Sequence, residues 1–167
     1  CLLDPRPSLP SIVRMVEHGF LLSEASNMPS MLELRIRACH VYGRFMAKDN
    51  VHPQFSRNNR VPEAEFDFSR VSLPPATYSQ EKHKIEQRLP ASVRYIADNG
   101  LNELFDGDVE EIGIIVQGGV YNTLMRSLNQ LGLADIFGKS RIPVFVLNVT
   151  FPLVPDEIAA FCAGKAT

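Results

Sequence analysis

Tryptophan is absent from this 167-residue chain, and cysteine is scarce. The three cysteines, Cys1, Cys39 and Cys162, are odd in number and far apart. A disulfide framework is therefore not expected, and a reducing, cytoplasmic location is. No run of about 18 apolar residues is present, so no membrane span is expected. Charge of neither sign dominates, since the net charge is -2, and neither nucleic acid nor an anionic membrane is an expected partner.

The clearest pattern lies in the segment from Asp108 to the end of the chain. Residues 111–116 and 144–149 are short, continuous apolar runs, which are typical of strands buried on both faces. Between them, Leu124, Leu128 and Leu131 recur at the spacing of a helix. This order predicts an α/β fold: an open parallel sheet covered by helices in three layers. A parallel sheet whose last element is a helix usually has one more strand, against which that helix packs. We therefore expect this chain to be a piece of a larger protein, cut before its last strand.

The first predicted part is residues 1–45, the end of a preceding domain. After a proline-rich start, we expect a helix over residues 12–26, with Ser11 as its N-cap, ended by Asn27 and Pro29. Residues 31–39 alternate between apolar and charged side chains, which predicts a half-exposed strand. A helix and one strand cannot close a core alone, so this part is read as a helix–strand remnant.

Two further parts follow. Residues 46–77 show no periodicity and are rich in proline and asparagine, which predicts an irregular interdomain connector. Residues 78–167 are the predicted α/β domain. It begins with a helix over residues 80–99, with Ser79 as its N-cap and an interruption at Pro90, closed by Asn99 and Gly100. Residues 101–105 are expected to form a short turn.

The strand-to-helix turn at Gln117-Gly118-Gly119 is the first candidate site. Free backbone amides at such a turn can hold an anion, and open α/β sheets place ligands at this edge. The candidate residues for a small anion or coenzyme A are Gly118, Gly119 and Asn122. The spacing matches neither the dinucleotide fingerprint nor the P-loop. The alternative is structural: the glycines allow a tight turn and close packing of helix against strand.

Other candidates carry weaker signals. Arg35, Arg37 and Arg44 put positive charge near His40, and they either contact an anionic cofactor of another domain or pair with neighbouring acids. The spacing of His40, His52 and the cysteines forms no zinc motif, so no metal site is expected, and Cys39 and Cys162 are read as buried. Residues 150–157 lie at the same sheet edge, where Pro155, Asp156 and Glu157 suit a helix start.

Three segments together resemble indolepyruvate ferredoxin oxidoreductase, a thiamine-diphosphate-dependent 2-oxoacid:ferredoxin oxidoreductase. They are EIGIIVQGGVYN at 111–122, LNVTFPL at 147–153 and PSMLELRIRACH at 29–40. The last is similar to the final strand of that family's pyrimidine-binding domain, which ends in an Arg-x-x-His pattern, here Arg37 and His40. The first two resemble its transketolase C-terminal-like domain. The resemblance covers most of the chain apart from the connector.

The resemblance implies that the full enzyme oxidatively decarboxylates aryl 2-oxoacids, transfers the acyl group to coenzyme A and passes electrons to ferredoxin. It implies thiamine diphosphate, magnesium and iron–sulfur clusters for the whole enzyme, and none bound by this piece, which lacks the family's activating glutamate, diphosphate motif and cluster cysteines. We therefore expect an inactive structural and interdomain module, whose partners are the remaining domains of its own chain, in an enzyme that is a homo-oligomer. Two alternatives remain open: a coenzyme A or small-anion module at Gly118-Gly119, and an oligomerisation domain.

Overall fold

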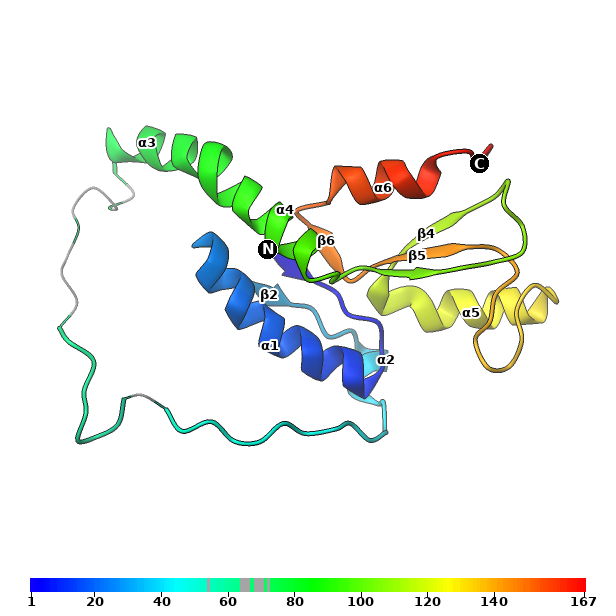
Figure 1. The fold of residues 1–167 in the computed structure, drawn as a ribbon, viewed down its shortest axis with the longest axis horizontal. Coiled ribbons are helices and arrows are strands. Elements are labelled where there is room, and N and C mark those ends of the chain that lie inside the picture. The colour runs from blue at the N-terminus through cyan, green and yellow to red at the C-terminus, as the bar shows by residue number, and fades with distance from the viewer. Residues whose placement is uncertain (54, 64–66, 68–70, 72) are drawn as a thin grey trace.

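The structure, a computed structural model, describes residues 1–53, 55–63, 67, 71 and 73–167. Within this described part, helices and strands alternate irregularly along the chain (Figure 1). Their bounds are β1 (Leu2–Leu3), α1 (Leu9–Ser26), β2 (Met31–Leu32), α2 (Ile36–Cys39), α3 (Ala76–His83), η2 (Lys84–Arg88), α4 (Leu89–Asp98), β3 (Glu103–Phe105), β4 (Ile114–Gln117), η3 (Gly118–Val120), α5 (Tyr121–Gln130), β5 (Val144–Leu147), β6 (Val149–Phe151) and α6 (Pro155–Cys162).

Two three-stranded sheets organise the chain. The first has the order β2-β1-β6, in which β1 pairs with β2 in parallel and with β6 antiparallel. The second has the order β3-β5-β4, in which β4 and β5 are parallel and β3 is antiparallel to β5. Only Asn148 separates β5 from β6, so one continuous stretch of chain contributes a strand to each sheet. The chain is thus an α/β protein with open sheets, as predicted.

The second sheet lies between two helices, with α5 on one side and α6 on the other (Figure 1). On one face of β5, Val144 and Val146 are fully buried in a cluster with Tyr121, Met125 and Leu128 of α5. On the other face, Phe145 stacks on Phe161 of α6, with ring centroids 5.5 Å apart. Because β5 is covered on both faces, its run of four apolar residues has no polar alternation. This is the three-layer arrangement that the sequence predicts.

The first sheet contributes to a core drawn from distant parts of the chain. Leu3, Met15 and Leu22, from β1 and α1, are buried together with residues of α4, the loop after α4, β6 and the segment before α6. Those partners are Ile96, Leu101, Val149 and Val154. Residues from both predicted parts, 1–45 and 78–167, therefore share one hydrophobic core. The domain boundaries at 45 and 78 stay a prediction, and the packing between the two parts is tight.

The helix starts differ from those predicted, while the ends agree. Helix α1 begins at Leu9, and its N-cap is Ser8, whose hydroxyl accepts a hydrogen bond from the Ser11 amide. The predicted N-cap Ser11 is wrong because Pro10 is tolerated in a first helical turn, which lets the helix begin earlier. Asn27 ends the helix in the left-handed conformation, with a φ of 51°.

The long helix after the connector also begins earlier than predicted, at Ala76 after Pro75, so Ser79 lies inside it and is not its N-cap. The predicted interruption is present: α3 passes through a π-helical turn into α4, and Pro90 occupies the first turn of α4. The helix is continuous through this point: the Leu89 amide donates to the Lys84 carbonyl five residues back, in the π-helical pattern, directly before Pro90, which has no amide proton to donate.

Two strand predictions need correction. The strand expected over residues 31–39 stops at Leu32, and a short helix forms at Ile36–Cys39 instead. Its partner β1 has only two residues, because Asp4 leaves the ladder and its amide donates to the carbonyl of Asn148. Conversely, the turn expected over residues 101–105 contains strand β3, which pairs with β5.

The described residues of the predicted connector lack helices and strands up to α3. Residues 41–53 and 55–63 run as a wide arc beside α1 (Figure 1). Its contact with the rest of the chain includes an exposed ion pair, with Lys48 Nζ 2.7 Å from Glu17 Oε1. The part of the predicted connector at residues 54, 64–66, 68–70 and 72 lies outside the described residues.

Candidate functional site: the glycine turn and its polar network

The predicted turn lies where β4 ends and α5 begins. Gly118 and Gly119 form a short 3-10 turn that continues directly into α5 at Tyr121. Neither glycine has a positive φ, so the turn does not need glycine for its backbone conformation. Glycine is needed at both positions because neighbouring atoms lie where a Cβ atom would be.

The residues that fill the space belong to the chain's own N-terminal segment, residues 4–7. A Cβ atom on Gly118 would collide with the carbonyl oxygen of Asp4 and lie 2.7 Å from the amide nitrogen of Arg6. A Cβ on Gly119 would collide with the Asp4 carboxylate and the Arg35 side chain. The third candidate, Asn122, donates from Nδ2 to the carbonyl of Pro7 at 3.4 Å. All three predicted site residues therefore contact the segment 4–7.

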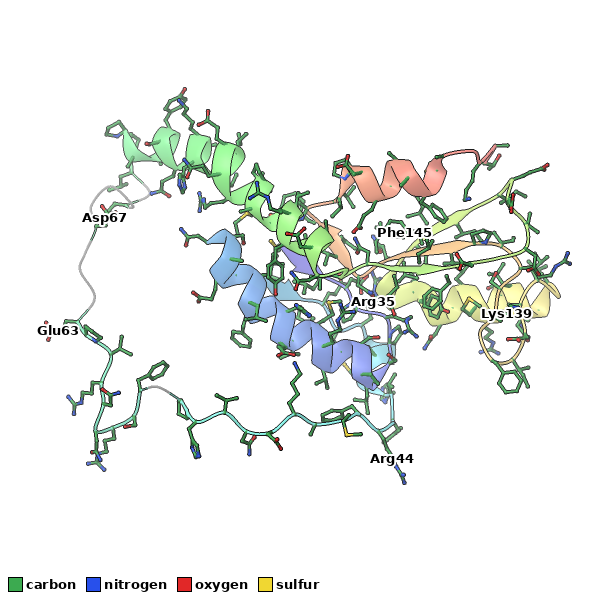
Figure 2. All side chains as sticks on the ribbon, in the orientation of Figure 1. Arg35, Arg44, Glu63, Asp67, Lys139 and Phe145 are labelled. Carbon is green, nitrogen blue, oxygen red and sulfur yellow. The ribbon has the colours of Figure 1, made fainter. Side chains whose placement is uncertain are left out.

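A carboxylate is present at this turn, and it is the side chain of Asp4. Asp4 is 1% exposed, and both of its oxygens accept hydrogen bonds from Arg35, at 2.9 Å to Nη2 and 3.3 Å to Nε. Arg35 Nη2 also donates to Gln117 Oε1 at 2.9 Å. The hydrogen bond with Asp4 is the main reason that the pKa of Arg35 lies above its ordinary value. Arg35 is labelled near the centre of Figure 2.

A second cluster adjoins the first through the backbone of residues 4–6. Arg6 makes a bidentate ion pair with Glu103 of β3: Nε donates to Oε2 at 3.0 Å and Nη2 donates to Oε1 at 2.9 Å. Its guanidinium also lies over two aromatic rings, 5.4 Å from the centroid of Phe105 and 5.2 Å from that of Tyr121. Such stacking suits the planar guanidinium group. Arg6 therefore fixes the N-terminal segment to both β3 and α5.

Asn148 completes this network at the junction of the two sheets. It is 1% exposed, its Oδ1 accepts from the Arg6 amide at 2.8 Å, and its Nδ2 donates to Leu101 O and to Glu103 Oε2, each at 3.0 Å. A buried side-chain amide is tolerated where its donors and its acceptor form hydrogen bonds, and those of Asn148 do. One side chain thus joins the segment 4–7, the loop between α4 and β3, and strand β3 itself.

The Glu103 carboxylate has a pKa below its ordinary value of 4.5. Burial, the largest single influence, raises the pKa of this group. The hydrogen bonds from Arg6 and Asn148 and the charges of Arg6 and Arg14 together outweigh burial. Glu103 is therefore held as an anion between its two donors.

Sequence reasoning found the turn but missed Asp4, Arg6, Glu103 and Asn148. One signal was present: Asn148 interrupts an apolar run, and a polar residue at a buried strand position needs partners. The prolines at 5 and 7 also hold the segment extended, which allows it to lie along the turn.

The remaining candidates are placed as follows. Arg35 joins the network, while Arg44 is exposed on the arc (Figure 2) and the side chain of Arg37 lies outside what the structure describes. His40 and His52 are exposed, and no group of three possible metal ligands occurs within the described residues. Cys39 and Cys162 are exposed, so their predicted burial is wrong: each is the last residue of a helix, Cys39 of α2 and Cys162 of α6.

The predicted helix start after β6 is present. Pro155, Asp156 and Glu157 occupy the first turn of α6, as the sequence indicates. None of the helices in the described part of the chain is long and apolar enough to cross a bilayer.

Comparison with known proteins gives two relatives. The chain is 29% identical over 169 residues to the indolepyruvate oxidoreductase subunit IorA of Methanothermobacter thermautotrophicus, and 29% identical over 161 residues to the subunit of the same name from Methanothermobacter marburgensis. These alignments cover 98% and 95% of this chain. The chain spans about a quarter of each relative's length, 25% and 24%.

No family model matches the chain, and no solved structure matches it. The resemblance stated from the residues is nevertheless confirmed by the two curated relatives: over nearly its whole length, this chain is similar to a segment of an indolepyruvate oxidoreductase subunit.

Proposed function

We propose that this chain is a noncatalytic interdomain module of an oxidoreductase that decarboxylates aryl 2-oxoacids of the indolepyruvate class, with ferredoxin as electron acceptor. The two relatives support the oxidoreductase role through their name. One observation carries the noncatalytic role: the glycine turn, the place where an α/β sheet would receive a ligand, is filled by the segment 4–7 of the same chain.

In this proposal, the polar groups around the turn stabilise the fold and do not bind a substrate. Asp4 occupies the position of an anion at the turn, and Arg35 neutralises it. Arg6, Glu103 and Asn148 satisfy one another, so their charges and amides are used within the chain. In the whole enzyme, thiamine diphosphate would supply the stabilisation of the carbanion formed on decarboxylation, and it, magnesium and the iron–sulfur clusters would be held by other segments.

Isothermal titration of the purified chain tests this proposal. We expect no heat of binding with thiamine diphosphate plus magnesium, and none with coenzyme A. Micromolar binding of thiamine diphosphate would overturn the noncatalytic assignment, because the cofactor would then be held by these residues.

One observation keeps the small-anion or coenzyme A alternative open. The Arg35 side chain is 35% exposed beside the turn, so part of this cationic side chain faces solvent. Heat with coenzyme A alone, lost in a folded Gly119→Val variant, would support that alternative. Retention of the heat in this variant would move the binding site away from the turn.

A further inference from the structure

Three segments of the chain meet around the side chain of His18 on α1. Its Nδ1 is 3.0 Å from the hydroxyl of Tyr95 on α4, and the two ring centroids are 6.0 Å apart. The arc that runs beside α1 forms its ion pair with Glu17, the residue next to His18. The charged residues of α4, Arg94 and Asp98, line a groove on the side of α6. We name the contact of α1, α4 and the arc around this imidazole the His18 junction.

The His18 junction includes a cation that is held in place. Arg14 lies one helical turn before His18, and residues four apart on a helix are neighbours. Its Nη2 donates to the carbonyl oxygens of Asn99 and Gly100, after the end of α4, at 2.8 Å and 3.1 Å. These bonds satisfy carbonyl groups at the helix end, and they keep the guanidinium from moving away from the imidazole.

A carboxylate also adjoins His18, and it is already paired. Both oxygens of Glu17 accept hydrogen bonds from Nζ of Lys48 on the arc, each at 2.7 Å. Alone, this carboxylate would favour a proton on His18, whereas the ammonium group of Lys48 opposes one. The protonation state of the imidazole is therefore coupled to the ion pair that fastens the arc to α1.

Burial and the cations of the junction disfavour a proton on His18. Burial is the largest cause that lowers the pKa of this imidazole, and the charge of Arg14 is the next. Glu17 raises the pKa, and Lys48 opposes this effect. Since the folded pKa lies below the ordinary value of 6.5, the junction contributes its full stability above pH 6.5 and loses it as the pH falls through the folded value.

We propose that the His18 junction is a proton-sensitive latch, which fastens α4 and the arc to α1 when the imidazole is neutral and loosens both when it is protonated. A protonated ring places a third cation beside Arg14 and Lys48, and it competes with Lys48 for the carboxylate of Glu17. The coupling is reciprocal, so a bound arc makes protonation harder and a released arc makes it easier. The latch acts on the packing between the first and third predicted parts, and it does not depend on the proposed enzyme function.

Proton NMR of the imidazole signals tests the electrostatic part of this proposal, from about pH 5 to about pH 8, where histidine titrates. Wild-type His18 should titrate with a midpoint below 6.5. Lys48→Gln and Arg14→Gln should each raise the midpoint, whereas Arg14→Lys, which keeps the charge, should leave it lowered. Three results overturn the latch: a wild-type midpoint at or above 6.5, a midpoint that neither neutral variant raises, or equal midpoints for Arg14→Lys and Arg14→Gln.

Amide hydrogen exchange, corrected for its intrinsic pH dependence, measures the loosening itself. Between about pH 7.5 and about pH 5.5, protection of the α1 and α4 amides should fall more in the wild type than in His18→Gln. Linkage limits this excess to about tenfold for one group with an unfolded pKa of 6.5. His52→Gln, on the exposed arc, is the matched control and should fall like the wild type.

Lys48→Gln gives a second test, because the Lys48 side chain is 78% exposed and its replacement leaves the core intact. Its protection should fall less than that of the wild type, since His18 is then protonated more easily in the folded chain. A His18→Gln chain whose protection falls as much as that of the wild type overturns the proposal. So does a Lys48→Gln chain that falls as much as the wild type, or a His52→Gln chain that falls as little as His18→Gln.

Discussion

At the scale of single residues, Asn148 has the most demanding position. It is buried at the junction of the two sheets, and its amide serves a backbone donor, a backbone acceptor and a carboxylate. An aspartate there has the same size and keeps the acceptor for the Arg6 amide. It loses both donors and adds a negative charge beside Glu103.

Asn148→Asp is therefore expected to lower the free energy of unfolding by about 2–3 kcal/mol at neutral pH, since buried groups lose their partners. Urea unfolding followed by circular dichroism measures the change. Asn58→Asp, the same substitution on the exposed arc, is expected to have little effect. Equal stability of the two variants would mean that the bonds of Asn148 contribute nothing.

Glu103 gives a prediction for the dependence of stability on pH. Its folded pKa is lowered, so its contribution is fully present above the ordinary carboxyl pKa of 4.5 and is lost as pH falls through the folded value. Glu103→Gln is expected to cost about 1–3 kcal/mol at pH 7, because the ion pair with Arg6 is lost. That cost should shrink as the pH is lowered below 4.5.

Urea unfolding of wild type and Glu103→Gln between pH 7 and pH 3 measures this difference. Glu24→Gln, an exposed carboxylate on α1, controls for the loss of one negative charge. A cost of Glu103→Gln that stays constant over the whole pH range would show that the carboxylate is not held as an anion by this network.

At the scale of elements, the sequence predicts what local pattern determines. The apolar run at 111–116 contains the start of β4, whose outer face is partly exposed, and the run at 144–149 is divided between β5 and β6 at Asn148. The leucine spacing became α5, which ends before Leu131, and Asn27 ended α1. Each of these depends on periodicity or on one residue's backbone preference, both readable along the chain.

Elements that depend on distant partners were missed. Strand β3 has three residues, one of them Glu103, and it exists because β5 lies beside it. The strand expected over residues 31–39 has the right alternation, yet it ends at Leu32 because its partner turns away at Asp4. Pairing of this kind is set by tertiary contacts, which no window of sequence contains.

The candidate site follows the same division. The glycine pair marked the turn, because glycine at a strand end signals either a close approach or a ligand. Which of the two it signals depends on residues 4–7, more than a hundred positions away in the sequence. The sequence pointed to Gly118, Gly119 and Asn122 at the turn. It did not point to the polar side chains of the network around the turn, which are Asp4, Arg6, Glu103 and Asn148.

At the scale of the whole molecule, two connections hold the chain together. The shared core brings β1, α1, α4 and β6 into contact, and the polar network fastens the segment 4–7 to the second sheet. Elements of the first and third predicted parts are therefore packed together, while the described residues of the connector lie outside this core.

The central claim is that the glycine turn seats the chain's own segment 4–7, and the most direct measurement is the free energy of unfolding of Gly118→Ala against that of Gly19→Ala. A Cβ on Gly118 would collide with the Asp4 backbone, whereas a Cβ on Gly19 in α1 meets no atom within 4 Å. We predict that Gly118→Ala lowers the free energy of unfolding by at least about 1–3 kcal/mol. Gly19→Ala should raise it by up to about 1 kcal/mol, because alanine has the higher helix propensity. A Gly118→Ala chain as stable as wild type would contradict the account, because the segment 4–7 could not then lie against the turn.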